Sequence, residues 1–199
     1  MAPTIQLKRV SGQALADCIN DVARLRIEVF REFPYLYEGT LDYEQKYLKT
    51  YTDCAQAVAV LALDNGKIIG ASTAIPMAHE TPEFQAPMKD AGYDLSKVFY
   101  CAESVLLPAY RGLGLGWRFF DEREAHAAEL GGFEVSCFCA VDRPDDHPLK
   151  PTNAKTRDSL WRKRGYRPLD VRATYRWKDI DQPEETEKTL RYWARELAH

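Results

Sequence analysis

Residues 111–116 read RGLGLG, and this segment limits the fold more than any other part of the sequence. It follows an apolar run at 98–107 and leads into a helix-like run that begins near Trp117. Glycine permits a positive φ and a close approach of the backbone to another group. The first amides of a helix have no partners within the helix and lie at the positive end of its dipole, so a loop of this kind is suited to bind a phosphate. The alternative is a tight turn that binds nothing.

Two common nucleotide-binding patterns do not match this loop. A P-loop requires Gly-Lys-Ser/Thr, whereas Trp117 follows Gly116. The dinucleotide pattern is G-x-G-x-x-G, whereas Gly112, Gly114 and Gly116 alternate with single residues. The spacing therefore speaks against a nucleotide-binding protein that takes ATP or NAD.

The distribution of apolar residues predicts an ordered series of strands and helices around the loop. The clearest unit is a hairpin with an Asn65-Gly66 turn. Strands are expected at 4–10, 57–63, 67–75, 98–107, 133–141 and 171–177. Helices are expected at 15–33, in a short stretch within 33–51, from 117 onward, at 156–165 and from about 181 to the end. The polar, turn-rich segment 79–97 is expected to be a long connection.

The segment 111–116 resembles the Q/R-x-x-G-x-G/A signature of the GNAT superfamily of N-acetyltransferases. The order of predicted elements from residue 4 to about 177 agrees with that family, and 160–166 (LWRKRGY) resembles its usual ending. The resemblance implies an α/β (α+β) fold with a central mixed, mostly antiparallel sheet, splayed between strands 4 and 5 and flanked by helices. We therefore expect residues 1–199 to form a single GNAT domain with a C-terminal helical extension at about 181–199.

The same resemblance implies acetyl-CoA as the acyl-donor cosubstrate. Backbone groups of the fourth strand bind the pantetheine arm in this family, and the glycine loop binds the pyrophosphate. Asn153 resembles an asparagine that some members set against the CoA arm, although its spacing to Trp161 is one residue longer than usual. The candidate cofactor-binding residues are therefore Val105, Leu106, Leu107, Arg111, Gly112, Leu113, Gly114, Leu115, Gly116 and Asn153.

Glu103 is the candidate catalytic base. It is the one carboxylate in the apolar run 98–107, and family members often place a glutamate on this strand for that role. The alternative is a glutamate on the solvated face or paired with an arginine. Trp161 stands where many members have the tyrosine that protonates the leaving thiolate, and an indole N–H is no acid at neutral pH. The thiolate then leaves unassisted, or Cys139, Tyr100 or a water serves as the acid.

The resemblance places the acceptor pocket around the first two helices and the loop between them. We expect Phe33, Tyr35 and Tyr37 to bind the acceptor, with neighbouring acids to attract a cation. Tyr43 belongs to the same aromatic group, and the acids are Glu32, Glu38 and Asp42. The alternative is that the aromatic residues pack in the core and the acids are solvated.

These expectations define an enzyme that transfers an acetyl group to the primary amine of a small molecule or peptide. The alternative is a sensor that binds acyl-CoA with little or no catalysis. The identity of the acceptor stays open.

The composition predicts a cytoplasmic protein without nucleic-acid or membrane partners. The net charge is −3, the sequence has no long apolar run, and the spacing of its five cysteines fits no disulfide or zinc-binding pattern. No metal is expected, although Asp142, Asp145, Asp146 and His147 cluster in a proline-rich loop. Leu190, Trp193 and Leu197 would form an apolar stripe on the last helix, which packs on its own domain or in a homodimer.

Overall fold

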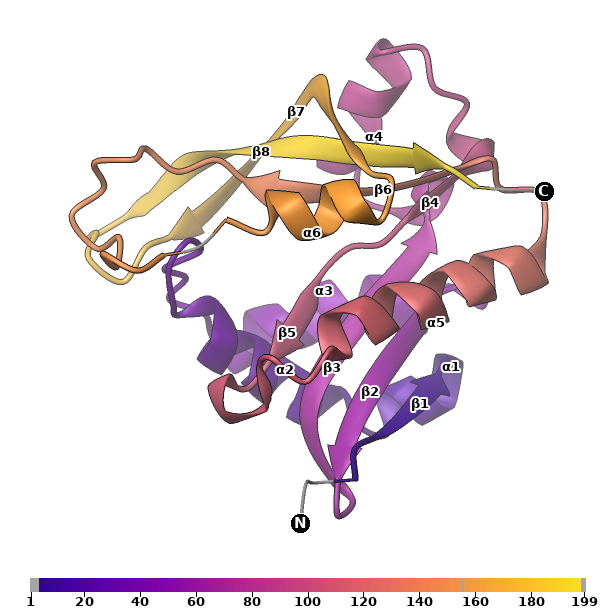
Figure 1. Cartoon of the computed structure of the whole chain (residues 1–199), viewed down its shortest axis with the longest axis horizontal. Coiled ribbons are helices and arrows are strands. Elements are labelled where there is room, and N and C mark those ends of the chain that lie inside the picture. Colours follow the sequence, from indigo (N-terminus) through magenta and orange to yellow (C-terminus); the bar gives the residue numbers. More distant parts are fainter. Residues whose placement is uncertain (1–3, 155, 198–199) are drawn as a thin grey trace.

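The structure, a computed structural model, describes residues 4–154 and 156–197 and is built around a mixed sheet (Figure 1). The strand order is β1-β2-β3-β4-β6-β8-β7, and β5 pairs with β3 beside β4. All of these pairs are antiparallel except β4 with β6. The strands are β1 (Gln6–Val10), β2 (Val58–Asp64), β3 (Lys67–Pro76), β4 (Val98–Tyr100), β5 (Ser104–Leu106), β6 (Val135–Val141), β7 (Arg167–Lys178) and β8 (Glu185–Glu196). The mixed, mostly antiparallel sheet is confirmed.

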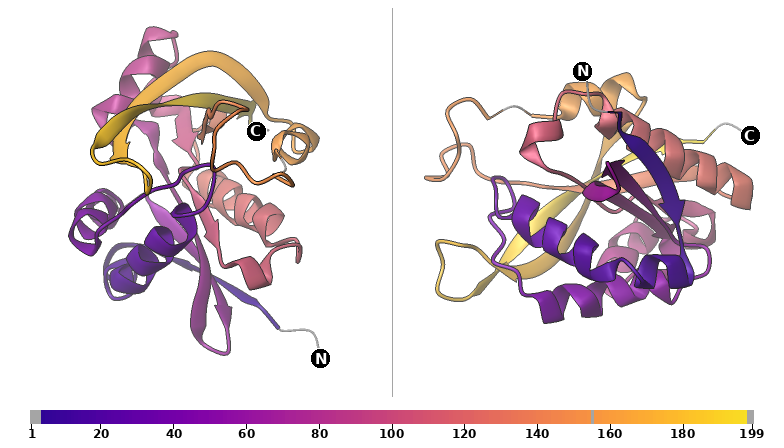
Figure 2. Two further views of the ribbon diagram at one scale, coloured as in Figure 1. Left: turned by 90° about the vertical axis from the view of Figure 1, so that its left-hand side faces the viewer. Right: turned by 90° about the horizontal axis from the view of Figure 1, so that it is seen from below.

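Helices cover both faces of the sheet (Figure 2). The helices are α1 (Gly12–Ala16), α2 (Ile19–Phe30), α3 (Leu41–Thr52), α4 (Pro82–Asp90), α5 (Leu115–Leu130) and α6 (Asp158–Lys163). Successive side chains of a strand point to opposite faces. Ala59 and Leu61 of β2 accordingly join the apolar cluster of α1, α2 and α3, whereas Val60 and Ala62 pack with Phe119 of α5. The central hairpin is therefore buried on both faces, which explains its nearly continuous apolar sequence.

The predicted strand at 98–107 is divided into β4 and β5, and the sheet opens at this division. β4 pairs in parallel with β6, and the last bond between them runs from the Cys101 amide to the Cys137 carbonyl (2.7 Å). β5 then pairs with β3 alone. Beyond Cys101 the chain thus leaves β6, as the ribbons of β5 and β6 in Figure 1 show. The sheet was expected to splay between the fourth predicted strand (98–107, here β4 and β5) and the fifth (133–141, here β6), and it opens there.

The predicted C-terminal helix at 181–199 is wrong, because this segment contains β8, which lies between β6 and β7. Period-two alternation puts Leu190, Tyr192 and Ala194 in the main core, while Trp193 stacks on Phe138 on the opposite face (centroids 6.3 Å apart). The buried segment therefore lacks an apolar helical stripe, which was the feature that suggested a homodimer. Leu190 and Trp193 satisfy helical spacing by coincidence, since a strand buried on both faces contains apolar residues at many spacings.

The connection at 79–97 contains a helix that the sequence reading missed. α4 begins at Pro82, a residue favoured in the first turn, and buries Phe84 and Met88. Pro87 lies inside this helix, and proline in a helix interior normally breaks the hydrogen-bond pattern, so the sequence predicted a connection and no helix here. α4 packs beside β7 and thereby brings Phe84 to the region where the sheet opens.

Candidate active site

The glycine loop forms the turn from β5 into α5. Gly112 and Gly114 have positive φ values of 83° and 76°, which favour glycine, and Gly114 is the residue that precedes the first turn of α5. Within the described chain, the amides of residues 112–116 donate to no protein acceptor. Five amides with free N–H groups at a helix N-terminus are therefore available to an anion.

The edge of β5 that faces away from β3 also has free backbone groups. The Leu107 amide donates to the Ile69 carbonyl (3.0 Å), and the Glu103 carbonyl accepts from the Thr73 amide (3.1 Å). Backbone groups alternate between the two edges of a strand, so those of Ser104 and Leu106 point to the open edge. Val105 and Leu107, two of the predicted cofactor-binding residues, instead direct their backbone groups toward β3.

Arg111 ties the glycine loop to this edge. Its Nε donates to the Leu106 carbonyl (3.2 Å), and its Nη1 pairs with Glu32 at the end of α2 (2.7 Å). Arg111, predicted to bind the cofactor, thus anchors the glycine loop to β5 and α2. Asn153, the last predicted cofactor residue, lies exposed in the loop before α6.

An aromatic cavity lies where β5 leaves β6. Tyr100 at the end of β4 lines it together with Ala102 and Glu103, which lie between β4 and β5, and with Cys139 of β6. Tyr35 and Tyr37, two of the residues predicted to bind the acceptor, line it, whereas Phe33 lies outside it and faces the ring of His147 (centroids 6.1 Å apart). The remaining lining residues are Arg26, Phe30, Tyr43, Glu44, Tyr47, Phe84, Tyr175, Trp177 and Leu190. Nine of the fifteen lining residues are aromatic, which makes the cavity a fit for an apolar or flat group.

Arg26 of α2 lies between two carboxylates in this cavity. It is buried, with 7% of its surface exposed, and hydrogen bonds to both Glu44 and Glu103. Its guanidinium also lies over the ring of Tyr47, 4.6 Å from the centroid. Burial opposes the charge of Arg26, but the two carboxylates outweigh burial and raise its pKa well above the ordinary value. One cation between two anions leaves the group with a net charge of −1.

Glu103 is therefore paired with an arginine, as one of the alternatives supposed, and it also lines the cavity. Glu44 Oε1 is buried and has no hydrogen-bond partner among the described residues. A buried acceptor without a donor is costly, and a ligand with N–H groups would satisfy it. The sequence reading missed Arg26 and Glu44 because both belong to amphipathic helices, where charged residues are normally solvated.

The candidate acids occupy two different environments. Trp161 packs against Phe138 and Trp193 (centroids 4.9 and 5.0 Å apart) and is part of an apolar cluster. Tyr100 and Cys139 lie in the cavity wall. Burial raises the pKa of the Tyr100 phenol and of the Cys139 thiol above their ordinary values, so both release a proton less readily.

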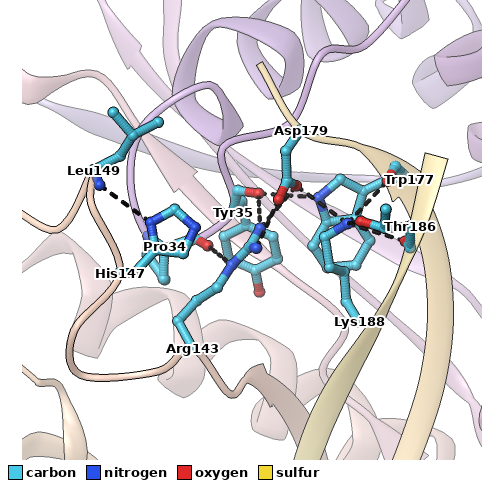
Figure 3. A network of polar contacts seen from close by, with 9 residues as sticks. All are labelled: Pro34, Tyr35, Arg143, His147, Leu149, Trp177, Asp179, Thr186 and Lys188. Carbon is cyan, nitrogen blue, oxygen red and sulfur yellow. Dashed lines mark hydrogen bonds and ion pairs between the residues drawn. The ribbon is translucent and has the colours of Figure 1, made fainter. Parts of the chain in front are cut away.

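A buried ionic network fixes the loop that carries Tyr35 (Figure 3). Arg143 donates to the carbonyls of Pro34 and Tyr35 (2.6 Å each) and forms a bidentate pair with Asp179 (2.7 and 2.9 Å). The Trp177 indole N–H donates to the same Tyr35 carbonyl (3.0 Å). Burial disfavours the charge of Asp179, but Arg143 and Lys188 outweigh it and lower the pKa of that carboxyl. The network attaches the loop that carries Tyr35 to the β7–β8 hairpin.

In the proline-rich loop at 142–153, several of the side chains that cluster as candidate metal ligands have partners within the protein. Asp142 pairs with Arg172, Asp145 pairs with Lys150 (2.6 Å), and His147 Nδ1 accepts from the Leu149 amide (3.2 Å). The part of the chain that the structure describes contains no group of three or more residues arranged to hold a metal ion. It also contains no helix long and apolar enough to cross a membrane.

Comparison with known proteins identifies the class. The sequence model of the Acetyltransferase (GNAT) family matches residues 22–149, which is more than half of the 199 residues. The chain therefore belongs to the GNAT family of acetyltransferases. No curated protein matches the sequence significantly.

Solved structures with GNAT folds resemble the chain over nearly its whole length. An N-acetyltransferase from Staphylococcus aureus Mu50 has 10% identity and a TM-score of 0.60, covering 97% of this chain and 98% of that one. A polyamine N-acetyltransferase from Drosophila melanogaster has 12% identity and a TM-score of 0.62, covering 98% and 100%. A ribosomal-protein-alanine N-acetyltransferase from Brucella melitensis has 12% identity and a TM-score of 0.61, covering 96% and 99%. At these identities the similarity shows the fold and not the acceptor.

Proposed function

We propose that the protein transfers an acetyl group from acetyl-CoA to the primary amine of a small molecule or peptide. The observation that carries the proposal is the position of the aromatic cavity. Glu103 lines it at the point where β5 leaves β6, next to the free backbone edge of β5. The glycine loop follows β5 after one short 3-10 helix, so a carboxylate, an open strand edge and a proposed phosphate site lie within the 14 residues 103–116.

In this proposal the donor binds mainly to backbone groups. The pyrophosphate binds the free amides of residues 112–116, and the pantetheine arm pairs with the Ser104 backbone and the Leu106 amide, since the Leu106 carbonyl already accepts from Arg111. The thioester then lies near Glu103, and a backbone amide near Leu106 stabilises the oxyanion. Because no side chain is required, hydrophobic residues of the strand serve the core and the donor at once.

The cavity is proposed to take the amine. The net charge of −1 from Arg26, Glu44 and Glu103 attracts an ammonium group, and the aromatic walls favour a cation or a flat apolar group. Glu103 accepts a proton from the amine, directly or through a water. The neutral amine nitrogen attacks the thioester carbonyl and the C–N bond forms. The C–S bond breaks as CoA thiolate leaves, and the second proton that the nitrogen gives up ends on this thiolate. A thiol with a pKa of ~8.5 is a tolerable leaving group without a strong acid.

An acetylation assay separates this proposal from the sensor alternative, which Trp161 in the usual place of the acid keeps open. The protein is incubated with acetyl-CoA and a panel of arylalkylamines, polyamines, amino acids and short peptides. We expect free thiol and acetylated amine to appear in equal amounts with at least one class. Tight binding of acetyl-CoA with thiol release at the protein-free rate for every class would instead support the sensor.

A further inference from the structure

Glu80 is a buried carboxyl group that the proposed reaction does not yet use. Only 3% of its surface is exposed, and it follows the short 3-10 helix Met77–His79. Its two oxygens accept from the Thr81 amide (2.9 Å) and the Tyr51 hydroxyl (2.8 Å). Throughout residues 4–154 and 156–197, no lysine, arginine or histidine forms an ion pair with it. A carboxyl buried without a cation is costly, so its presence calls for an explanation.

Two tyrosines of α3 connect Glu80 to the cavity. The Tyr51 hydroxyl, which donates to Glu80, lies 3.4 Å from the Tyr47 hydroxyl. Tyr51 is fully buried, whereas Tyr47 lines the cavity beside Arg26 and Glu103. Tyr47 and Tyr51 are four residues apart and therefore share one face of the helix. The result is a line of hydroxyl groups from the cavity to a buried carboxyl.

We propose that Glu80 is the final acceptor of the proton that the amine releases, reached from the cavity through Tyr47 and Tyr51. The inference rests on the proposed function. The ammonium proton reaches the Tyr47 oxygen by way of Glu103 or a water, Tyr47 passes its own proton to Tyr51, and Tyr51 passes its proton to Glu80. The amine becomes neutral, Glu80 becomes a neutral acid, and both phenols end as they began. After the product leaves, the proton returns to solvent along the same line.

Among the buried groups around this line of hydroxyls, Glu80 is the one that changes charge near neutral pH. Burial raises the pKa of Glu80 to about 7. The charged neighbours that act on it are Glu103 and Arg26, which form an ion pair with each other, while His79 and Glu83 face solvent. Burial raises the pKa of the phenols and the thiol around it, so these groups stay protonated: Tyr47, Tyr51, Tyr100, Tyr175, Tyr192 and Cys139. The relay is therefore open above pH 7 and closed below it.

The pH dependence of turnover tests the relay. We would measure kcat between pH 6 and 8 with saturating acetyl-CoA and amine for the wild type, Glu80→Gln, Tyr51→Phe and Glu83→Gln. In the wild type kcat is expected to rise about tenfold with a midpoint near 7, as a base must be ionised to act. Glu80→Gln and Tyr51→Phe are each expected to abolish this rise, whereas Glu83→Gln, which removes an exposed carboxylate nearby, keeps it. An unchanged midpoint in Glu80→Gln would overturn the proposal.

A second measurement does not depend on turnover. In uniformly ¹³C,¹⁵N-labelled wild-type protein, the Glu80 carboxyl is identified by NMR through sequential backbone and side-chain assignment, and its titration is followed from pH 4 to 9. A midpoint near 7 that rises in Tyr51→Phe, where a hydrogen bond to the ionised form is lost, supports the relay. A midpoint near the ordinary value for glutamate, or no effect of Tyr51→Phe, overturns it even if Glu80→Gln is unstable. A wild type that releases no thiol at any pH would instead count against the proposed function.

Discussion

At the scale of single residues, the chemistry of the cavity depends on Arg26. Without it, Glu44 and Glu103 would lose the cation that each is bonded to, and a buried carboxylate without its partner is costly. With it, the pair becomes a hydrogen-bonded group of net negative charge that still presents carboxylate oxygens to the cavity. Glu103 thus has two roles: it pairs with Arg26 of α2, and it is the proposed base for the amine.

Glu103→Gln tests the proposed base. The amide oxygen of glutamine retains an acceptor for Arg26, so the fold is expected to persist, whereas proton transfer is lost. We expect kcat to fall at least about 100-fold, the usual contribution of a general base, with little change in the KM for acetyl-CoA. Glu129→Gln, which removes an exposed carboxylate of α5, is the matched control. Turnover equal to that of the control would show that the base lies elsewhere.

Glu80 also predicts a dependence of stability on pH. Its pKa in the folded chain is raised to about 7, so folding favours the protonated form; this stabilises the protein below the unfolded pKa and is lost as pH rises through 7. The loss attributable to Glu80 is about 3 kcal/mol between pH 4.5 and 7. Chemical denaturation of wild type and Glu80→Gln at several pH values measures it. The difference between them should grow in favour of Glu80→Gln as pH rises; a constant difference would contradict this account.

At the scale of elements, the loop before α5 was predictable because its local sequence is enough to determine its conformation. Alternating glycines between an apolar run and a helical run specify a strand, a tight turn and a helix start. The elements around it were harder. The segment 185–196 is a strand because side chains on both of its faces are buried in apolar clusters, and α4 forms despite Pro87 because it buries Phe84 and Met88. Tertiary packing decided both, and local sequence does not contain that information.

A pair of glycine substitutions tests the loop geometry. Gly114 has a φ of 76° and open space where a Cβ would lie, so Gly114→Ala is expected to lose about 1 kcal/mol from backbone strain alone. Gly116 lies in the first turn of α5 with equally open space, and Gly116→Ala is expected to be neutral or to gain roughly 0.5 kcal/mol. Denaturant titration of the ligand-free protein measures both. Equal stability of the two variants would mean that the left-handed turn does not form.

At the scale of the whole molecule, the cavity joins parts of the chain that the sequence keeps far apart. Glu103, Tyr35 and Tyr37 were predictable from a strand motif and from the loop after the first helices. Tyr175 and Trp177 of β7 were not, because the register of β7 on β8 and its approach to α4 bring them there. The predicted Phe33 lies only two residues from Tyr35 yet outside the cavity, since the loop turns between them.

Arg143 holds these parts together, and its removal should affect the acceptor side. In Arg143→Met the carbonyls of the loop and Asp179 lose their buried partner, so we expect a loss of about 3 kcal/mol in unfolding free energy. The KM for the amine should rise while acetyl-CoA binding is unchanged. Arg172→Met, which removes a more exposed arginine on β7, is expected to change stability by less than about 0.5 kcal/mol. Equal effects of the two variants would contradict a clamp at Arg143.

The most direct test of the central claim is thermal unfolding of the wild-type protein with acetyl-CoA, with ATP and NAD as controls. If the glycine loop and the open edge of β5 bind acetyl-CoA, a concentration of about 100 times its Kd adds ~2.7 kcal/mol to the folded state and clearly raises Tm. ATP and NAD should leave Tm nearly unchanged. No rise with saturating acetyl-CoA, or an equal rise with ATP or NAD, would contradict an acetyl-CoA site at the splay of the sheet.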